Sequence, residues 1–225
     1  LEKLLFPSYE FYQKLENNLE NFPDNIFVNC PRTEYPFYSI IKNSINKNQK
    51  VNIICSDIID IGSNAIHWID LAYFLTGRNI DIKDQFKINI SELYPSKRKG
   101  YYDFIGNVNV ESRSFNLSIK SFIPNNINCE EEFLLTFGNS KFKVNETKSN
   151  LNSNIENIQS KMEINVPFQS QLTAEYFKSF EKGNLKLTKF HDSFLIHKKF
   201  FLAFEKEILN IKNKNYHTKQ NYFLT

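Results

Sequence analysis

The side chains best suited to proton chemistry stand together in residues 62–77, where Asn64, His67 and Asp70 recur every three residues. In a helix this spacing puts them on one face, because positions three or four apart are neighbours. An imidazole ordinarily titrates near neutral pH, so His67 is a candidate general base, and Asp70 or Asn64 is a candidate to fix its tautomer. The opposing interpretation is a satisfied, half-buried histidine in a largely apolar helix.

Residues 62–77 have the boundaries of one helix. Ser63 or Asn64 is the expected N-cap, an apolar run follows, and Gly77 is expected to end the helix in a left-handed conformation. Residues 50–56 alternate apolar and polar side chains, which predicts a strand leading into this helix.

The start of the chain carries a second group of charged residues. Residues 1–6 read as the end of a buried strand with Glu2 and Lys3 at its edge, a helix follows from Pro7, and residues 25–29 form a short strand before Arg32. Taken alone, Glu2 and Lys3 are an ordinary charged pair at a strand end. The helix is expected to bury Phe11, Leu15 and Leu19.

Together these motifs resemble the Gfo/Idh/MocA family of NAD(P)-dependent sugar oxidoreductases. In that family the nucleotide-binding domain ends with an E-K-P motif, a helix and a strand that ends near an Arg, and the second domain carries a G-x-H-x-x-D-type helix that ends in Gly. The matching residues are Glu2, Lys3, Arg32, His67, Asp70 and Gly77.

Two positions depart from the family pattern. Leu4 stands where the family has a proline, often in a cis bond that a Leu adopts only at a cost of several kcal/mol. Ser63 stands four residues before His67, where many members have Asp, and Asn64 is the nearest substitute.

The resemblance implies a domain plan and a cofactor. Residues 1–30 would be the C-terminal remnant of a dinucleotide-binding (Rossmann) domain, and residues 31–225 a Gfo/Idh/MocA-like C-terminal α/β domain. The cofactor would be NAD or NADP, bound mainly by an N-terminal domain absent from this sequence. The six glycines form no G-x-G-x-x-G fingerprint, and the first residue is Leu1 rather than Met, so we expect a longer natural protein.

The resemblance also implies roles for single residues. Lys3 and His67 would carry proton transfer, and Glu2 and Lys3 would contact the cofactor. The substrate would be bound by Asn64, Asp70, Arg32 and Arg98.

The rest of the chain predicts an α+β fold, an open-faced, mainly antiparallel β-sheet flanked by helices, with the terminal helix and strand of a Rossmann domain at the N-terminus. Alternating runs near residues 86–90, 102–110, 115–119 and 133–137 predict strands, and Gly138-Asn139 predicts a hairpin turn. Residues 145–160 are polar and are expected to form a loop. A strand at 162–166, a helix at 172–180 that Gly183 ends, and a long helix capped by Thr188 and buried on the face of His197 should follow.

Composition excludes several classes. A net charge of +3 with 24% charged residues does not indicate a nucleic-acid surface, and no apolar run approaches the roughly 20 residues of a membrane helix. No set of residues has metal-ligand spacing. Three separated cysteines, Cys30, Cys55 and Cys129, suit free thiols in a reducing compartment, so we expect a soluble cytoplasmic protein.

The expected function is therefore the substrate-binding and oligomerisation part of an oxidoreductase that transfers hydride between a sugar and nicotinamide. A surface-polysaccharide or nonulosonic-type sugar is the expected substrate class, and the open sheet face is the expected homo-oligomer contact. The fragment alone should be inactive. The alternative is a non-catalytic sugar-binding or assembly module, which Leu4 and Ser63 favour.

Overall fold

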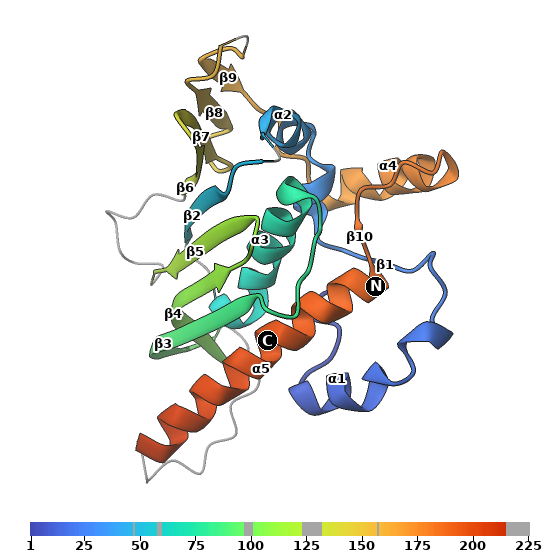
Figure 1. Ribbon diagram of the computed structural model, residues 1–225, viewed down its shortest axis with the longest axis vertical. Helices are drawn as coiled ribbons and strands as arrows, with labels where there is room; N and C mark the ends of the chain where they lie inside the picture. Colours follow the sequence, from blue (N-terminus) through green and yellow to red (C-terminus); the bar gives the residue numbers. More distant parts are fainter. Residues whose placement is uncertain (47, 58–59, 97–100, 123–131, 157, 215–225) are drawn as a thin grey trace.

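The computed structural model describes residues 1–225 except 47, 58–59, 97–100, 123–131, 157 and 215–225. An eight-stranded open sheet has the strand order β3-β4-β5-β2-β6-β7-β8-β9, and helices lie along it (Figure 1). Only β2 and β5 pair in parallel, so the sheet is mainly antiparallel and the predicted α+β class is confirmed. The strands are β2 (Val51–Asp57), β3 (Gln85–Pro95), β4 (Tyr102–Glu111), β5 (Phe115–Ser121), β6 (Glu132–Phe137), β7 (Ser140–Asn145), β8 (Asn150–Ser153) and β9 (Lys161–Glu163).

The helices cover the sheet, and the first of them lies near the start of the chain. They are α1 (Tyr9–Glu16), α2 (Pro36–Ser44), α3 (Ile61–Thr76), α4 (Gln169–Glu181) and α5 (Phe190–Lys214), with short 3₁₀ turns η1 (Leu19–Asn21) and η2 (Pro31–Glu34). A separate two-stranded sheet pairs β1 (Phe27–Val28) with β10 (Thr188–Lys189), so it joins the beginning of the chain to the entrance of α5. In the part of the chain that the structure describes, no helix is long and apolar enough to cross a bilayer.

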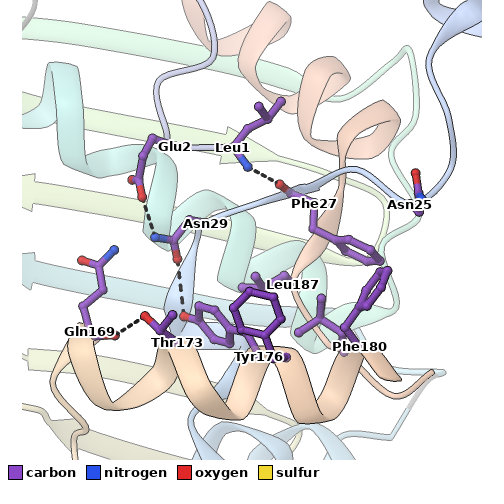
Figure 2. A pocket seen from close by; sticks show the side chains of 12 residues that line it. Leu1, Glu2, Asn25, Phe27, Asn29, Gln169, Thr173, Tyr176, Phe180 and Leu187 are labelled. Carbon is purple, nitrogen blue, oxygen red and sulfur yellow. Dashed lines mark hydrogen bonds between the residues drawn. The ribbon is translucent and has the colours of Figure 1, made fainter. Parts of the chain in front are cut away.

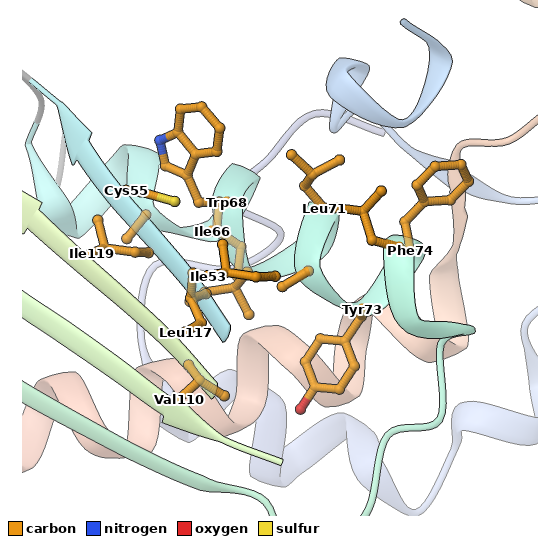
Figure 3. Packing of buried hydrophobic residues seen from close by; sticks show 14 of the residues in the cluster. Ile53, Cys55, Ile66, Trp68, Leu71, Tyr73, Phe74, Val110, Leu117 and Ile119 are labelled. Atoms are coloured by element: carbon orange, nitrogen blue, oxygen red, sulfur yellow. The ribbon is translucent and has the colours of Figure 1, made fainter. Parts of the chain in front are cut away.

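The core lies between one sheet face and α3 (Figure 3). Side chains alternate along a strand, so Ile53 and Cys55 of β2, and Leu117 and Ile119 of β5, all point to this face and are buried. Ile66 of α3 packs against them. Burying an aliphatic side chain of this size contributes about 1.5–3 kcal/mol, so these contacts fix α3 on the sheet.

The other face of the sheet carries mostly polar side chains, as expected for an open face. Asn52, Asn109 and Asn116 are exposed there, and Ile54 is an apolar exception that is 50% exposed. A hollow of about 590 Å³ crosses β2 to β5 on this side. The open face is confirmed, and its use in oligomer contacts stays a prediction.

The start of α3 differs from the sequence prediction. Gly77 ends the helix at φ 98° as expected, but the N-cap is Asp60 and not Ser63 or Asn64. The Asp60 carboxylate accepts hydrogen bonds from the backbone N–H groups of Gly62 and Ser63 at 3.0 and 2.8 Å. Asp caps as well as Ser or Asn do, so the first turn begins earlier and Asn64 lies inside the helix.

The face of α1 was predicted only in part, because Leu15 and Leu19 pack partly buried against the core as expected but Phe11 does not. Phe11 is 46% exposed, whereas Tyr12 is fully buried and its ring lies 5.2 Å from Phe194 and 5.3 Å from Phe201 of α5. The Tyr12 hydroxyl accepts a hydrogen bond from the backbone N–H of Phe6 at 3.2 Å. A tyrosine whose polar end is satisfied can serve as the helix's core contact.

Two later predictions need correction. Residues 145–160 are not one loop, because β8 pairs with β7 and β9 and buries Leu151. Thr188 does not cap α5, which begins at Phe190, since its hydroxyl is bonded to Asp70 instead. Strand β8 is stabilised by its backbone pairing. Its residues are mostly polar, so they show no apolar alternation that would predict a strand.

Candidate active site

Lys3 lies against the first turn of α3. Its Nζ donates hydrogen bonds to the backbone oxygen of Ser63 at 2.8 Å and to Oδ1 of Asn64 at 3.0 Å. The peptide bond between Lys3 and Leu4 is cis. The structure thus brings two of the predicted site residues, Lys3 and Asn64, into direct contact across 61 positions of sequence.

Asn64 and His67 mark the opening of an otherwise buried helix. From Ile61 to Leu75, these are the two positions of α3 that are not buried. They lie one turn apart on the side that meets Lys3. Polar groups that share a partly accessible face beside a lysine amine make this the candidate site.

Burial lowers the pKa of Lys3, and the nearby positive charge of Arg32 lowers it further. Cys30, Asp60 and Glu2 act in the opposite direction. Desolvation is the larger effect, because a charged amine loses hydration when it is enclosed. The Lys3 amine is therefore easier to deprotonate than a surface lysine.

The expectation that His67 titrates near neutral pH is wrong. Burial lowers its pKa well below the ordinary value, and the charges of Arg32 and Lys3 add to this effect. At neutral pH the imidazole is therefore uncharged, and it is a weaker base than an exposed histidine. Its Nδ1 is buried and has no hydrogen-bond partner among the described residues.

Asp70 does not orient His67 as predicted. Its Oδ1 accepts a hydrogen bond from the Thr188 hydroxyl at 2.5 Å, and the residue is 2% exposed. Burial raises the pKa of Asp70 to about 6. Asp70 therefore joins α3 to the segment that leads into α5.

Arg32 is held by residues that the sequence did not connect with it. Its Nε and Nη2 donate to the two carboxylate oxygens of Glu146 at 2.9 and 2.8 Å, and the Tyr38 hydroxyl donates to the same carboxylate at 2.8 Å. The guanidinium carbon lies 3.8 Å from the centre of the Trp68 ring. This two-point pairing and stacking set the orientation of Arg32.

Asp60 is the site residue that sequence reasoning missed. Besides capping α3, its Oδ1 accepts a hydrogen bond from the backbone N–H of Phe104 at 2.7 Å, and burial raises its pKa. Asp60 thereby fixes the first turn of α3, which carries Asn64, to strand β4. The feature of the sequence that could have identified Asp60 as the cap is its position two residues before Gly62.

Glu2 borders a groove of about 610 Å³ between the start of the chain, β1 and α4 (Figure 2). Its carboxylate accepts a hydrogen bond from Asn29 Nδ2 at 2.8 Å, and Asn29 Oδ1 accepts one from the Tyr176 hydroxyl at 3.4 Å. The wall is largely apolar and includes Phe27, Tyr176, Phe177, Phe180 and Leu187. Glu2 thus lies in the wall of this groove, whereas the Lys3 amine contacts α3.

The remaining predictions on site residues are settled only in part. Arg98 and Cys129 lie outside the described residues. Cys30 and Cys55 are buried and are not part of a disulfide, as expected. Over the described ranges, no cluster of His, Cys, Asp and Glu has a geometry that could hold a metal ion.

The fold is shared with solved structures of oxidoreductases. Biliverdin reductase from Synechocystis sp. PCC 6803, solved with biliverdin and NADP+, has a TM-score of 0.63 at 10% identity, over 91% of this chain and 70% of that chain. The WlbA dehydrogenase from Bordetella pertussis, solved with NADH and UDP-GlcNAcA, has a TM-score of 0.56 at 12% identity, over 93% of this chain and 68% of that chain.

A further likeness is to the super-repressor mutant of Gal80p from Saccharomyces cerevisiae, with a TM-score of 0.60 at 11% identity over 93% of this chain and 70% of that chain. No family model and no curated protein matches the sequence. At these identities the likeness concerns the fold. The chain therefore has the α+β fold of the Gfo/Idh/MocA-type oxidoreductases, and the resemblance seen in its sequence is confirmed at that level.

Proposed function

We propose that this chain is the substrate-binding and oligomerisation part of an NAD(P)-dependent sugar oxidoreductase. The observation that supports this most is the contact of the Lys3 amine with Asn64, one helical turn from His67, where the first half of α3 is partly accessible. The shared fold supports the same class. Residues 1–30 are then the end of a nucleotide-binding domain and residues 31–225 the C-terminal domain.

In this proposal the residues of the chain handle the proton. Oxidation of a sugar CH–OH group releases the hydroxyl proton, and His67, whose lowered pKa keeps the imidazole in the neutral form, is the proposed acceptor. Lys3, whose pKa is also lowered, binds the hydroxyl oxygen and exchanges the proton with solvent. A bound nicotinamide supplies the acceptor for the hydride that leaves the same carbon.

The groove at Glu2 fits one end of such a cofactor, because Tyr176 and Phe180 offer flat apolar surfaces in the same wall as Glu2 (Figure 2). The six glycines of the sequence are scattered and form no glycine-rich motif for a pyrophosphate. Among the described residues, the glycines with positive φ stand at the ends of α3 and α4 and in the hairpin after β6. Most of the cofactor would be held by an N-terminal nucleotide-binding domain.

The substrate-binding roles follow from how each side chain is held. Asn64 lies beside Lys3 and can bind a sugar hydroxyl. Arg32 offers a fixed guanidinium whose charge is already shared with Glu146, which suits hydroxyl groups better than a second carboxylate. Asp70 is enclosed, so we assign it to positioning α3 through Thr188 rather than to contact with the sugar. Arg98 stays a predicted substrate contact.

The test is a substrate screen on the intact natural protein. Nucleotide-linked and acidic sugars are offered with NAD and with NADP, and reduction of the cofactor is followed spectrophotometrically. Turnover with one sugar class supports the proposal. Calorimetry of residues 1–225 alone with NADH should show no binding at micromolar concentrations, since the glycine fingerprint is missing.

The second candidate is a non-catalytic sugar-binding or assembly module. The pairing of Arg32 with Glu146 favours it, because the guanidinium charge is already shared with a carboxylate. The enclosure of His67 favours it as well, because burial makes the imidazole a weaker base for a reacting sugar. The likeness to a repressor structure is in keeping with it. Saturable sugar binding to the intact protein without reduction of either cofactor would select this candidate.

A further inference from the structure

A hollow of about 760 Å³ lies at the opposite end of α3 from the candidate active site. It is lined by residues 78–82 of the link from α3 to β3, by the turn between β4 and β5, and by the first turns of α5 (Figure 1). Helix α3 has 16 residues that each rise about 1.5 Å, so the hollow lies roughly 20 Å along the helix axis from the contact of Lys3 with Asn64. It is therefore separate from the candidate active site.

The first cationic group in the wall of this hollow is Arg78. Its backbone has φ 58°, a left-handed conformation that residues other than glycine rarely adopt. The Arg78 N–H donates to the carbonyl of Tyr73 at 2.6 Å, and Nη2 of its guanidinium donates to the carbonyl of Lys186. The Nε of Arg78 is buried and has no hydrogen-bond partner among the described residues. Arg78 is thus held in place while part of its donor capacity is unused.

The second cationic group is Arg113, in the turn between β4 and β5. The turn is fixed by its backbone, because the Ser112 N–H donates to the carbonyl of Phe115 at 2.9 Å and the Ser114 carbonyl accepts from Val51 at 3.0 Å. The Arg113 side chain is exposed, and within the described ranges it forms no ion pair. Two guanidinium groups that line one hollow favour a ligand with phosphate or carboxylate oxygens.

The same hollow carries two carboxylates. Asp192 is in the first turn of α5, and Asp81 is in the link, where its Oδ1 accepts from the Lys83 N–H at 2.8 Å. In the part of the chain that the structure describes, neither forms an ion pair. These charges oppose a bare anion, whereas hydroxyl groups can donate hydrogen bonds to them. The charge pattern therefore favours a ligand that combines an anionic group with hydroxyl groups.

Apolar and amide side chains complete the wall. Ile82 is 90% exposed and Leu195 is 37% exposed, and both line the hollow together with Asn79. A binding site usually combines apolar contact area with a few polar groups that set the orientation of the ligand. A sugar ring offers C–H surface to the apolar side chains and hydroxyl groups to the amide and the carboxylates.

We propose that this hollow is a second binding site, which takes a sugar phosphate. Arg78 and Arg113 bind the phosphate oxygens, and Asp81 and Asp192 accept hydrogen bonds from sugar hydroxyl groups. A phosphate monoester carries close to two negative charges and three acceptor oxygens, enough for both guanidinium groups. The site involves none of the residues assigned to proton transfer, so it does not rest on the proposed function.

Titration calorimetry of the intact protein tests this, with glucose 6-phosphate, inorganic phosphate and glucose as the probes. We expect glucose 6-phosphate to bind with a Kd below about 1 mM, and each of the other two to bind at least about tenfold more weakly. Arg113→Gln should weaken the binding of glucose 6-phosphate at least about tenfold, because it removes a charged donor from an exposed turn. Lys87→Gln, at an exposed position of β3, is the matched control and should bind like wild type.

Asp192→Ala tests the sugar half of the site. It should weaken glucose 6-phosphate but not inorganic phosphate, because it removes a hydroxyl acceptor and a charge that repels anions. Absence of glucose 6-phosphate binding up to about 5 mM would overturn the proposal. Wild-type affinity in Arg113→Gln would overturn it too, since the phosphate would then bind elsewhere, and wild-type affinity in Asp192→Ala would leave a plain anion site instead. The measurement needs no turnover, so its outcome is separate from that of the proposed function.

Discussion

The Thr188 hydroxyl donates a hydrogen bond to the buried Asp70 carboxylate at 2.5 Å, although the two residues lie 118 positions apart in sequence. This bond ties α3, which carries the candidate site, to the β1–β10 pair and the entrance of α5. The start of the chain, where Lys3 lies, is joined to the same pair by the bridge between Glu2 and Asn29. The site is therefore held by contacts at the first turn and in the middle of α3.

Asp70 should make stability depend on pH. The folded state raises its pKa from 3.8 to about 6, so the folded chain binds this proton more tightly than the unfolded chain. Its stabilising contribution is complete below about pH 4 and is lost as the pH rises through about 6. Asp70→Asn keeps an acceptor for Thr188 and carries no charge. The free energy of unfolding of the variant, relative to wild type, should rise by about 1–3 kcal/mol between about pH 4 and pH 7.

Urea unfolding at a series of pH values measures this difference. Other titrating groups cancel because they are common to both proteins. A difference that stays constant over the whole pH range would show that Asp70 ionises as an ordinary carboxylate, and the account of its burial would be wrong.

Removing the N-cap should be costly. Asp60→Ala deletes the acceptor of three backbone N–H groups, one of them the buried N–H of Phe104. A lost cap costs about 0.5–2 kcal/mol and a stranded buried donor about 1–3 kcal/mol, so we expect a loss of about 2–4 kcal/mol by urea denaturation. Asp24→Ala is the matched control, because that side chain is 86% exposed, and it should change stability by less than about 0.5 kcal/mol. Equal effects of the two variants would contradict the assignment of Asp60.

The pairing of Arg32 with Glu146 should show a measurable coupling. Both side chains are less than one-fifth exposed, at 18% and 16%, and two hydrogen bonds join them. A double-mutant cycle of Arg32→Ala and Glu146→Ala should give about 1–3 kcal/mol of interaction energy. The exposed pair of Lys14 and Glu10 should give no measurable coupling in the same cycle. A coupling for Arg32 no larger than that of the control would mean that Glu146 does not hold the guanidinium.

The helix at the site was predictable because local residue types determine where it ends. Gly77 stops α3 where a left-handed residue is needed, and the spacing of Asn64 and His67 gave their common face. The start was misplaced by one turn, since Ser63, Asn64 and Asp60 are all acceptable caps and the choice depends on the contact of Asp60 with Phe104 in a later strand.

The properties of the site residues were less predictable because they arise from distant segments. The lowered pKa of His67 depends on its enclosure and on Arg32 and Lys3, which only the folded chain brings near. The Glu146 partner of Arg32 lies 114 positions away in a polar region that was expected to be a loop. Sequence patterns predict local structure, whereas the pKa and the charged partners of a side chain depend on which segments the fold brings together.

The most direct test of the account is the turnover of the intact protein with Lys3→Met and His67→Gln, using the sugar that supports reduction of the cofactor. If these residues transfer the proton, kcat should fall by about 10² or more in each variant, while KM changes only a few-fold. Lys14→Met, at an exposed position of α1, should keep wild-type turnover. Wild-type kcat in both Lys3→Met and His67→Gln would contradict the proposed role of this site.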